Sequence, residues 1–172
     1  MIKQSFSRVF LDFGAKMLFN RIKMSFKKVR GFECVHCHQW VPFDKFIGTH
    51  FRNHCPYCLW SKHVDEKKSG DRQTFCRGNM EPIGLTFKKE GLDKYGKPRQ
   101  GELMVIHQCQ DCGQISINRL AADDKPQIVL KIFEESKKLG KETLEKIKAE
   151  NIKLLVDEDK EEIQTQLFGK KV

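Results

Sequence analysis

The stretch RNHCPYCLW, residues 52–60, decides the fold, because its Cys-Pro-x-Cys turn can present two thiolates to one metal ion. Another Cys-x-x-Cys pair lies upstream at Cys34 and Cys37, with seventeen residues between Cys37 and Cys55. This spacing is typical of a four-cysteine zinc site, in which each pair sits on a tight turn at the end of a β-hairpin. We therefore predict that Cys34, Cys37, Cys55 and Cys58 bind one zinc ion.

Two other uses of paired cysteines fit the sequence less well. A thioredoxin-like redox pair needs a βαβ setting, which the sequence around residues 34–58 lacks. An iron–sulfur cluster takes the same four thiolates, so it stays open at this level.

The three remaining cysteines predict a second metal site that needs one histidine, because tetrahedral zinc takes four ligands. We favour His63, since it leads into the turn before Cys76 and has the freedom to fold back. His54, which directly precedes a ligand of the first site, and His107, two residues before Cys109, stay open. So does a site without a fourth protein ligand, whose free position would be typical of a catalytic zinc. The predicted ligands of the second ion are Cys76, Cys109, Cys112 and His63.

The composition indicates a small domain that metal ions stabilise. The chain has 172 residues, of which 32% are charged and 39% hydrophobic, so a large apolar core is not expected. From residue 32 onward the cysteine region predicts short strands and turns, with a hairpin formed by residues 83–88 and 102–107. The predicted fold class is a small α+β domain with zinc-ribbon-like β-hairpins, two zinc sites, a basic N-terminal arm and a helical C-terminal tail.

The first 31 residues carry most of the positive charge. Eight Lys or Arg stand against the single Asp12 there, whereas residues 32–120 have a net charge of +3 and residues 121–172 of −1. Apolar residues recur at helical spacing along this segment, which fits an arm on nucleic-acid phosphates, a helix on an anionic membrane, an organellar presequence or a helix packed on the domain. We favour the nucleic-acid arm, because aromatic residues alternate with its cations.

A second basic group lies in the loop of the predicted hairpin, over residues 88–99. Arg52, Arg72 and Arg119 could either contact RNA or brace the metal turns through Asp65, Asp71 and Asp123, and we favour the brace. The predicted RNA-contacting residues are Arg8, Lys16, Arg21, Lys23, Lys27, Lys28, Arg30, Arg52, Lys88, Lys89, Lys94, Lys97, Arg99 and Arg119.

The end of the chain predicts helices. Asp123 and Asp124 with Pro126 supply a helix start, and Lys137, Lys138 and Gly140 supply its end. Further helices are expected over residues 142–156 and 159–168. We thus divide the chain into an arm over 1–31, a metal domain over 32–125 and a helical extension over 126–172, the last separable from the metal domain.

The compartment follows from the cysteines. No secretory signal precedes them, so we expect a reducing compartment, the cytoplasm, or an organellar matrix if the basic N-terminus acts in targeting. No segment of the sequence is long and apolar enough to span a bilayer.

Short motifs follow one another in a specific order: RNHCP at 52–56, LWSKHVD at 59–65, GDR at 70–72, CRGNMEPI at 76–83, CQDCG at 109–113, NR at 118–119 and DD at 123–124. Together they resemble the RNHCP domain family over about residues 32–125. The resemblance implies a compact zinc-binding module in which His63, Cys76 and the last cysteine pair belong to one design. It implies no particular biochemical activity, and the arm and the tail lie outside it.

These features predict a non-enzymatic RNA-binding protein with two zinc ions, ribosomal or ribosome-associated, that contacts rRNA within a ribonucleoprotein through its arm and hairpin loop. One alternative is a zinc enzyme acting on nucleic acid or nucleotides at the three-cysteine site, although no His-x-Glu motif accompanies the cysteine pair. Another is a protein-interaction or transcription-type zinc ribbon, whose C-terminal helices dock a protein partner.

Overall fold

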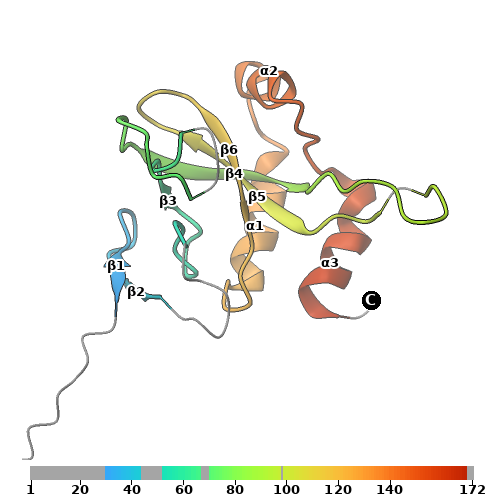
Figure 1. Cartoon of the computed structure of the whole chain (residues 1–172), viewed down its shortest axis with the longest axis horizontal. Coiled ribbons are helices and arrows are strands. Elements are labelled where there is room, and N and C mark those ends of the chain that lie inside the picture. The colour runs from blue at the N-terminus through green and yellow to red at the C-terminus, as the bar shows by residue number, and fades with distance from the viewer. Residues whose placement is uncertain (1–29, 44–51, 67–69, 98, 170–172) are drawn as a thin grey trace, which may run out of the picture.

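The computed structural model describes residues 30–43, 52–66, 70–97 and 99–169 (Figure 1). The predicted arm therefore lies outside the described residues up to residue 29, as do its RNA-contacting residues from Arg8 to Lys28. The strands are β1 Gly31–Glu33, β2 Trp40–Pro42, β3 Ser61–Lys62, β4 Asn79–Phe87, β5 Leu103–Cys109 and β6 Ile115–Arg119. The helices are α1 Pro126–Ser136, α2 Lys141–Ala149 and α3 Lys160–Phe168, the last preceded by a 3-10 turn at Asp157–Asp159.

The strands form two antiparallel sheets, which confirms the predicted α+β class. β1 and β2 make a separate hairpin, and β3-β4-β5-β6 make a four-stranded sheet in that order. β5 lies in the centre, and its residues are buried on both faces apart from Gln108, which is half-buried. A strand that is apolar on both faces needs cover on each side of the sheet.

The C-terminal helices provide that cover, so the expectation of a separable tail is wrong. Leu85 and Val105, opposite each other on β4 and β5, pack with Phe133 of α1 and Ile163 of α3 in one buried cluster. A second cluster joins Ile106 and Ile115 of the sheet to Ile147 of α2. The sheet and the helices share one fold, and neither would keep its apolar surface from water alone.

The predicted hairpin is present but longer than expected. β4 begins at Asn79, four residues before the predicted start, and pairs with β5 through Cys109. Its register shifts between Pro82 and Gly84, and such a bulge accommodates a proline, which has no N–H for the ladder. The extra length places Cys109 opposite Met80 and delivers the third cysteine pair at the end of β5.

The helix predictions hold for α1 and α3 but not for the length of α2. The sequence predicted one helix over 142–156, whereas α2 ends at Ala149 and Asn151 takes a left-handed φ of 57°. The chain then extends, so that the Leu155 N–H donates to the Leu85 carbonyl at 2.9 Å and the Leu155 side chain is buried. Among the described residues, no helix has the length and apolar character needed to cross a membrane.

Asp123 and Asp124 do not cap α1, contrary to the prediction. The N-cap residue is Lys125, no side-chain hydrogen bond caps the helix, and Pro126 occupies its first position. The two carboxylates instead bind back to residues 52–54, as described below.

Candidate metal centres

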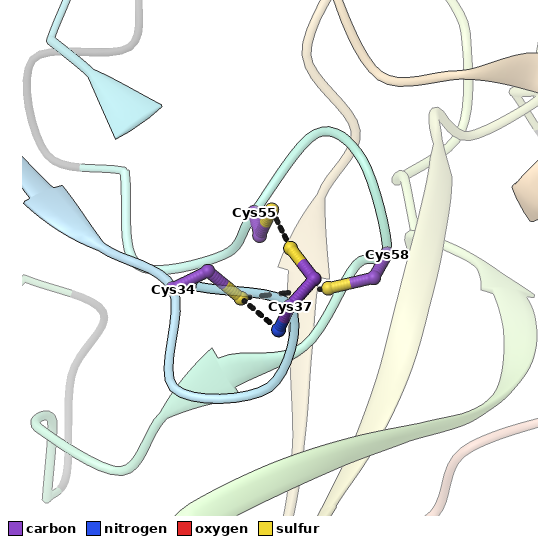
Figure 2. A group of neighbouring side chains, drawn as sticks. All are labelled: Cys34, Cys37, Cys55 and Cys58. Atoms are coloured by element: carbon purple, nitrogen blue, oxygen red, sulfur yellow. Dashed lines mark hydrogen bonds between the residues drawn. The ribbon is translucent and has the colours of Figure 1, made fainter. Parts of the chain in front are cut away.

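The first four cysteines converge on one point, as Figure 2 shows. Their sulfur atoms all lie within 4.8 Å of one another. Cys34 Sγ is 3.5 Å from Cys58 Sγ, and Cys37 Sγ is 3.5 Å from Cys55 Sγ. Each close pair joins one cysteine of the β1–β2 hairpin to one of the turn at residues 55–58, so a metal ion here would fasten the hairpin to the rest of the domain.

The three Cys-x-x-Cys turns share one backbone conformation. In each, the first cysteine donates its N–H to the carbonyl five residues later at 2.9 Å, and its own carbonyl accepts from the N–H four residues later. The residues in the latter position, His38, Leu59 and Gly113, have left-handed φ angles of 58°, 61° and 76°. In the first two turns, backbone N–H groups also point at the first sulfur at 3.4 Å. Such N–H groups stabilise thiolate rather than thiol, which is the metal-binding form.

The sulfur spacing fits a single tetrahedral ion such as zinc. With Zn–S bonds of about 2.3 Å, the edges of a tetrahedron of sulfurs are about 3.8 Å long. Two of the sulfur–sulfur distances are 3.5 Å, and all of them are within 4.8 Å, so the four sulfurs are spaced near that length. An iron–sulfur cluster places several irons between its thiolates and needs a wider group.

The second group contains His63, Cys76, Cys109 and Cys112, whose ligand atoms also lie within 4.8 Å of one another. His63 Nδ1 is 3.4 Å from Cys112 Sγ, and Cys76 Sγ is 3.6 Å from Cys109 Sγ. His63 directly follows β3 and Cys76 precedes β4, and the His63 N–H donates to the Gly78 carbonyl at 2.9 Å. The group therefore takes two donors from beside the paired strands β3 and β4, one from the last residue of β5 and one from the turn after it.

Gly78 makes this approach possible. A Cβ at this position would lie 2.6 Å from Asp111 Oδ2 and 2.7 Å from Cys109 Sγ. Both distances are too short for real contacts, so any side chain would displace the Asp111 carboxylate and push Cys109 Sγ away from His63 and Cys76.

Hydrogen bonds between the thiols separate their pKa values. The Cys58 thiol lowers the pKa of Cys55 to about 5 by hydrogen bonding to it, and the same bond raises the pKa of Cys58 above its usual range. Because the thiolate is the ligand, a divalent cation that binds here must displace the proton held on Cys58. Metal affinity should therefore fall as the pH is lowered.

The other two candidate histidines belong to hydrogen-bond networks instead of a metal group. His54 Nε2 lies 2.8 Å from Asp124 Oδ2, and both side chains are buried. His107 is fully buried, and burial lowers its pKa to about 3, so its ring is neutral. Its Nε2–H donates to the Leu59 carbonyl at 2.6 Å and its Nδ1 accepts from Asn118, which ties the second cysteine turn to β5.

Arg52 acts as the brace that the sequence favours, and the predicted contact of its charge with RNA phosphates is corrected. Its side chain is 2% exposed, and its guanidinium forms a fork with the Asp123 carboxylate and a further bond to Asp124 at 3.1 Å. Asp124 Oδ2 also accepts from the Ala121 N–H. A buried guanidinium held in this way cannot reach a phosphate.

Asn53 joins the same stretch to the neighbouring loop. Its Nδ2 donates to Asp65 at 2.9 Å, and its Oδ1 accepts from Arg72 at 3.0 Å. The Asp65 carboxylate in turn accepts the N–H groups of Gly70 and Arg72. Residues 52–54 thus fix the cysteine turn to the segment before α1 and to the loop before Cys76.

The predicted RNA-contacting residues that the structure describes lie elsewhere. Lys94, Lys97 and Arg99 are exposed in the loop between β4 and β5. Lys88 pairs with Glu90, and Lys89 Nζ donates to the Asn151 carbonyl at 2.5 Å. The remaining two, Arg30 and Arg119, are also exposed, and Arg119 pairs with Glu102 at 2.8 Å.

Sequence reasoning missed the structural roles of Gly78, Asn53 and Asp124. For Asp124, the sequence signal was the pair of neighbouring acids Asp123 and Asp124. Asp124 lies 70 residues after His54, and no local motif links it to the Arg52-x-His54 stretch. Gly78 lies between a cysteine and a strand, where a glycine often marks a close approach of another chain segment.

A family model, the RNHCP domain, matches residues 29–130, which is more than half of the chain. The matched range contains both cysteine groups, residues 52–54 and Asp124, so the resemblance noted from the motifs is confirmed. Comparison with curated proteins and with solved structures gave no match.

Proposed function

The chain belongs to the RNHCP domain family, and from this premise we propose that it is a non-enzymatic, zinc-dependent RNA-binding protein, a component or close associate of the ribosome. The observation that supports this most is the loop between β4 and β5, which extends beyond the sheet and the helices (Figure 1). Over residues 88–99 the loop carries five cations against two carboxylates.

The loop has the chemistry of a single-strand binding surface. Tyr95 is 74% exposed, and the Lys94 ammonium lies 4.9 Å from the centre of its ring. Asp93 holds the tip in shape, because its carboxylate accepts the N–H groups of Tyr95 and Lys97. Exposed cations beside an exposed ring are suited to RNA, since phosphates pair with the cations and unpaired bases stack on the ring.

Both metal ions have structural roles in this proposal. A catalytic zinc keeps one coordination position open, whereas each group here offers four protein donors. Zinc held by reduced thiols suits a reducing compartment, so we place the protein in the cytoplasm, or in an organellar matrix if its basic N-terminus directs import.

The test is the salt dependence of binding to rRNA fragments. Replacing Lys94, Lys97 and Arg99 with Ser should lower the slope of log K against log salt by about 2, because each lost phosphate contact removes about 0.7 from it on single strands. Deleting residues 1–29 should lower the slope further. The matched control replaces three exposed lysines of the C-terminal helices, Lys131, Lys141 and Lys148.

If neither the loop variant nor the deletion changes affinity or slope, the protein does not bind RNA in the proposed way. Sedimentation of the protein from its own cells decides the ribosomal part separately. The protein should travel with ribosomal particles at low salt and leave them at high salt.

A further inference from the structure

A cavity of about 340 Å³ lies beside the first cysteine group, between the β1–β2 hairpin and the segment that follows residue 52. This volume is within the range of roughly 300–1,000 Å³ found for small-ligand sites. Its lining is mostly apolar, with cationic groups beside aromatic rings. The lining includes Phe32, Phe43, Trp60, Arg52, Lys62 and Arg72.

Three aromatic rings line the cavity in fixed positions. Phe32 and Phe43 pack against each other at 5.9 Å between ring centres. Trp60 stacks on His36, with ring centres 4.4 Å apart and planes within 8° of parallel. The rings are therefore pre-oriented, and planar bases of any sequence stack on such rings.

Arg52 contributes a buried donor without a partner. Its terminal nitrogens bind Asp123 and Asp124, but within the described residues no acceptor lies near its Nε–H. Buried N–H groups are rarely left unpaired in native proteins. A carbonyl oxygen or a ring nitrogen of a bound ligand could accept this bond, and every nucleobase edge offers one or the other.

Two cations lie at the same cavity. Lys62 is exposed, and the described residues include no ion-pair partner for it. Arg72 is exposed as well, with one guanidinium nitrogen on Asn53. They could meet the phosphates on either side of a base that enters the cavity.

We propose that this cavity binds one unstacked base of single-stranded RNA, with Phe43 and Trp60 as the stacking surface, Arg52 Nε as the hydrogen-bond donor and Lys62 on the flanking phosphate. The inference rests on the proposed RNA-binding function and adds a specific base site to it. The cavity differs from the loop between β4 and β5, where cations and the ring of Tyr95 are exposed on the surface.

Tryptophan fluorescence tests the site directly, because the chain has two tryptophans and Trp40→Phe leaves Trp60 alone. Titrating the zinc-loaded Trp40→Phe protein with an eight-nucleotide oligouridylate or oligoadenylate should quench Trp60 in a saturable way. The same oligonucleotide without bases should bind without quenching. Phe43→Leu keeps an apolar side chain but removes the ring, and should weaken binding at least about fivefold.

Lys62→Ala should weaken binding about fivefold at 0.1 M salt and lower the salt slope by about 0.7, whereas the control Lys148→Ala should change neither. Zinc content and helical circular dichroism check that each variant is folded. RNA binding without any change at Trp60, or with full affinity in Phe43→Leu and Lys62→Ala, overturns the base site and leaves the proposed function standing. No binding of any RNA by the full chain overturns both, and saturable quenching by an apolar peptide alone would assign the cavity to a protein partner instead.

Discussion

Gly78 is a position beside the second metal group where an added side chain has no room. A methyl group at this position would lie so close to the Asp111 carboxylate and to Cys109 Sγ that it cannot fit without displacing both side chains. We expect Gly78→Ala to displace Cys109 from His63 and Cys76, to weaken the second zinc site at least tenfold and to cost about 1–3 kcal/mol of stability. Competition with a chromophoric chelator measures the affinity of each site.

Gly91→Ala is the matched control, since nothing lies within 4 Å of the Cβ that it would add. It should leave both zinc affinities unchanged. Equal zinc affinity in Gly78→Ala and Gly91→Ala would show that the turn can shift without disturbing the ligands.

Asp124 is the carboxylate on which residues 52–54 depend. It accepts from Arg52 and from His54 in the protein interior, and from the Ala121 N–H in a partly buried position. Asp124→Ala would leave the buried guanidinium with only Asp123, so we expect a loss of about 3–5 kcal/mol in the free energy of unfolding. Urea denaturation in the presence of zinc measures this loss.

An exposed acid provides the comparison for that measurement. Glu145→Ala on α2 removes the same charge from the surface and should change stability by less than about 0.5 kcal/mol. A similar midpoint for Asp124→Ala and Glu145→Ala would mean that the Arg52 brace contributes nothing to folding.

These residues show how far a sequence can be interpreted one position at a time. Cysteine spacing indicates its own partners, because a zinc site needs four donors at tight turns. The position of His63 before the turn at Cys76 also led to its correct assignment to the second group. A brace role for Arg52 was favoured from the sequence, but the pairing of His54 with Asp124 gave no such signal. The two residues are 70 positions apart, and their bond depends on how the sheet places the start of α1.

At the scale of elements, apolar periodicity located the strands and helices but not where they end. The segment after α2 has apolar residues that continue a helical pattern, and a helix was predicted through residue 156. The pattern cannot tell a helix face from an extended segment whose residues fill a gap in the core. β6 was missed because it is only five residues long and its last two residues, Asn118 and Arg119, are polar.

Leu155 tests the extended segment. It is buried in the same cluster as Leu85 and Phe133, and its backbone N–H donates to Leu85. We expect Leu155→Ala to lower the free energy of unfolding by about 2–5 kcal/mol, as for other buried leucines. Leu144→Ala, on the 40% exposed side chain of α2, should cost much less.

Thermal or urea denaturation of the two variants gives the comparison. If Leu155→Ala is as stable as Leu144→Ala, the C-terminal segment does not belong to the core and the tail is separable after all.

Two kinds of feature can stabilise the whole molecule, apolar clusters and candidate metal groups, and they are unevenly distributed. The four-stranded sheet is covered by two apolar clusters that include the helices. The β1–β2 hairpin has a small cluster in which Cys34, Val41 and Cys55 are the buried members, so two of the three buried residues belong to the first candidate metal group. The hairpin should therefore depend on the first ion far more than the sheet depends on the second.

Removal of metal should affect the β1–β2 hairpin much more than the four-stranded sheet. We expect a chelator to abolish amide-exchange protection in residues 31–42 while residues 103–109 of β5 keep most of theirs, because the ladder and the apolar clusters of the sheet remain. Acidification should also reduce protection in the hairpin, because the thiolates of the first group become protonated and release the ion. Cys34→Ser with Cys37→Ser should reproduce the effect on the hairpin at neutral pH with the second ion still bound. Equal loss of protection in the hairpin and in β5 would show instead that the two metal groups and the sheet fold as one cooperative unit, and that the clusters around α1 and α2 cannot hold the sheet by themselves.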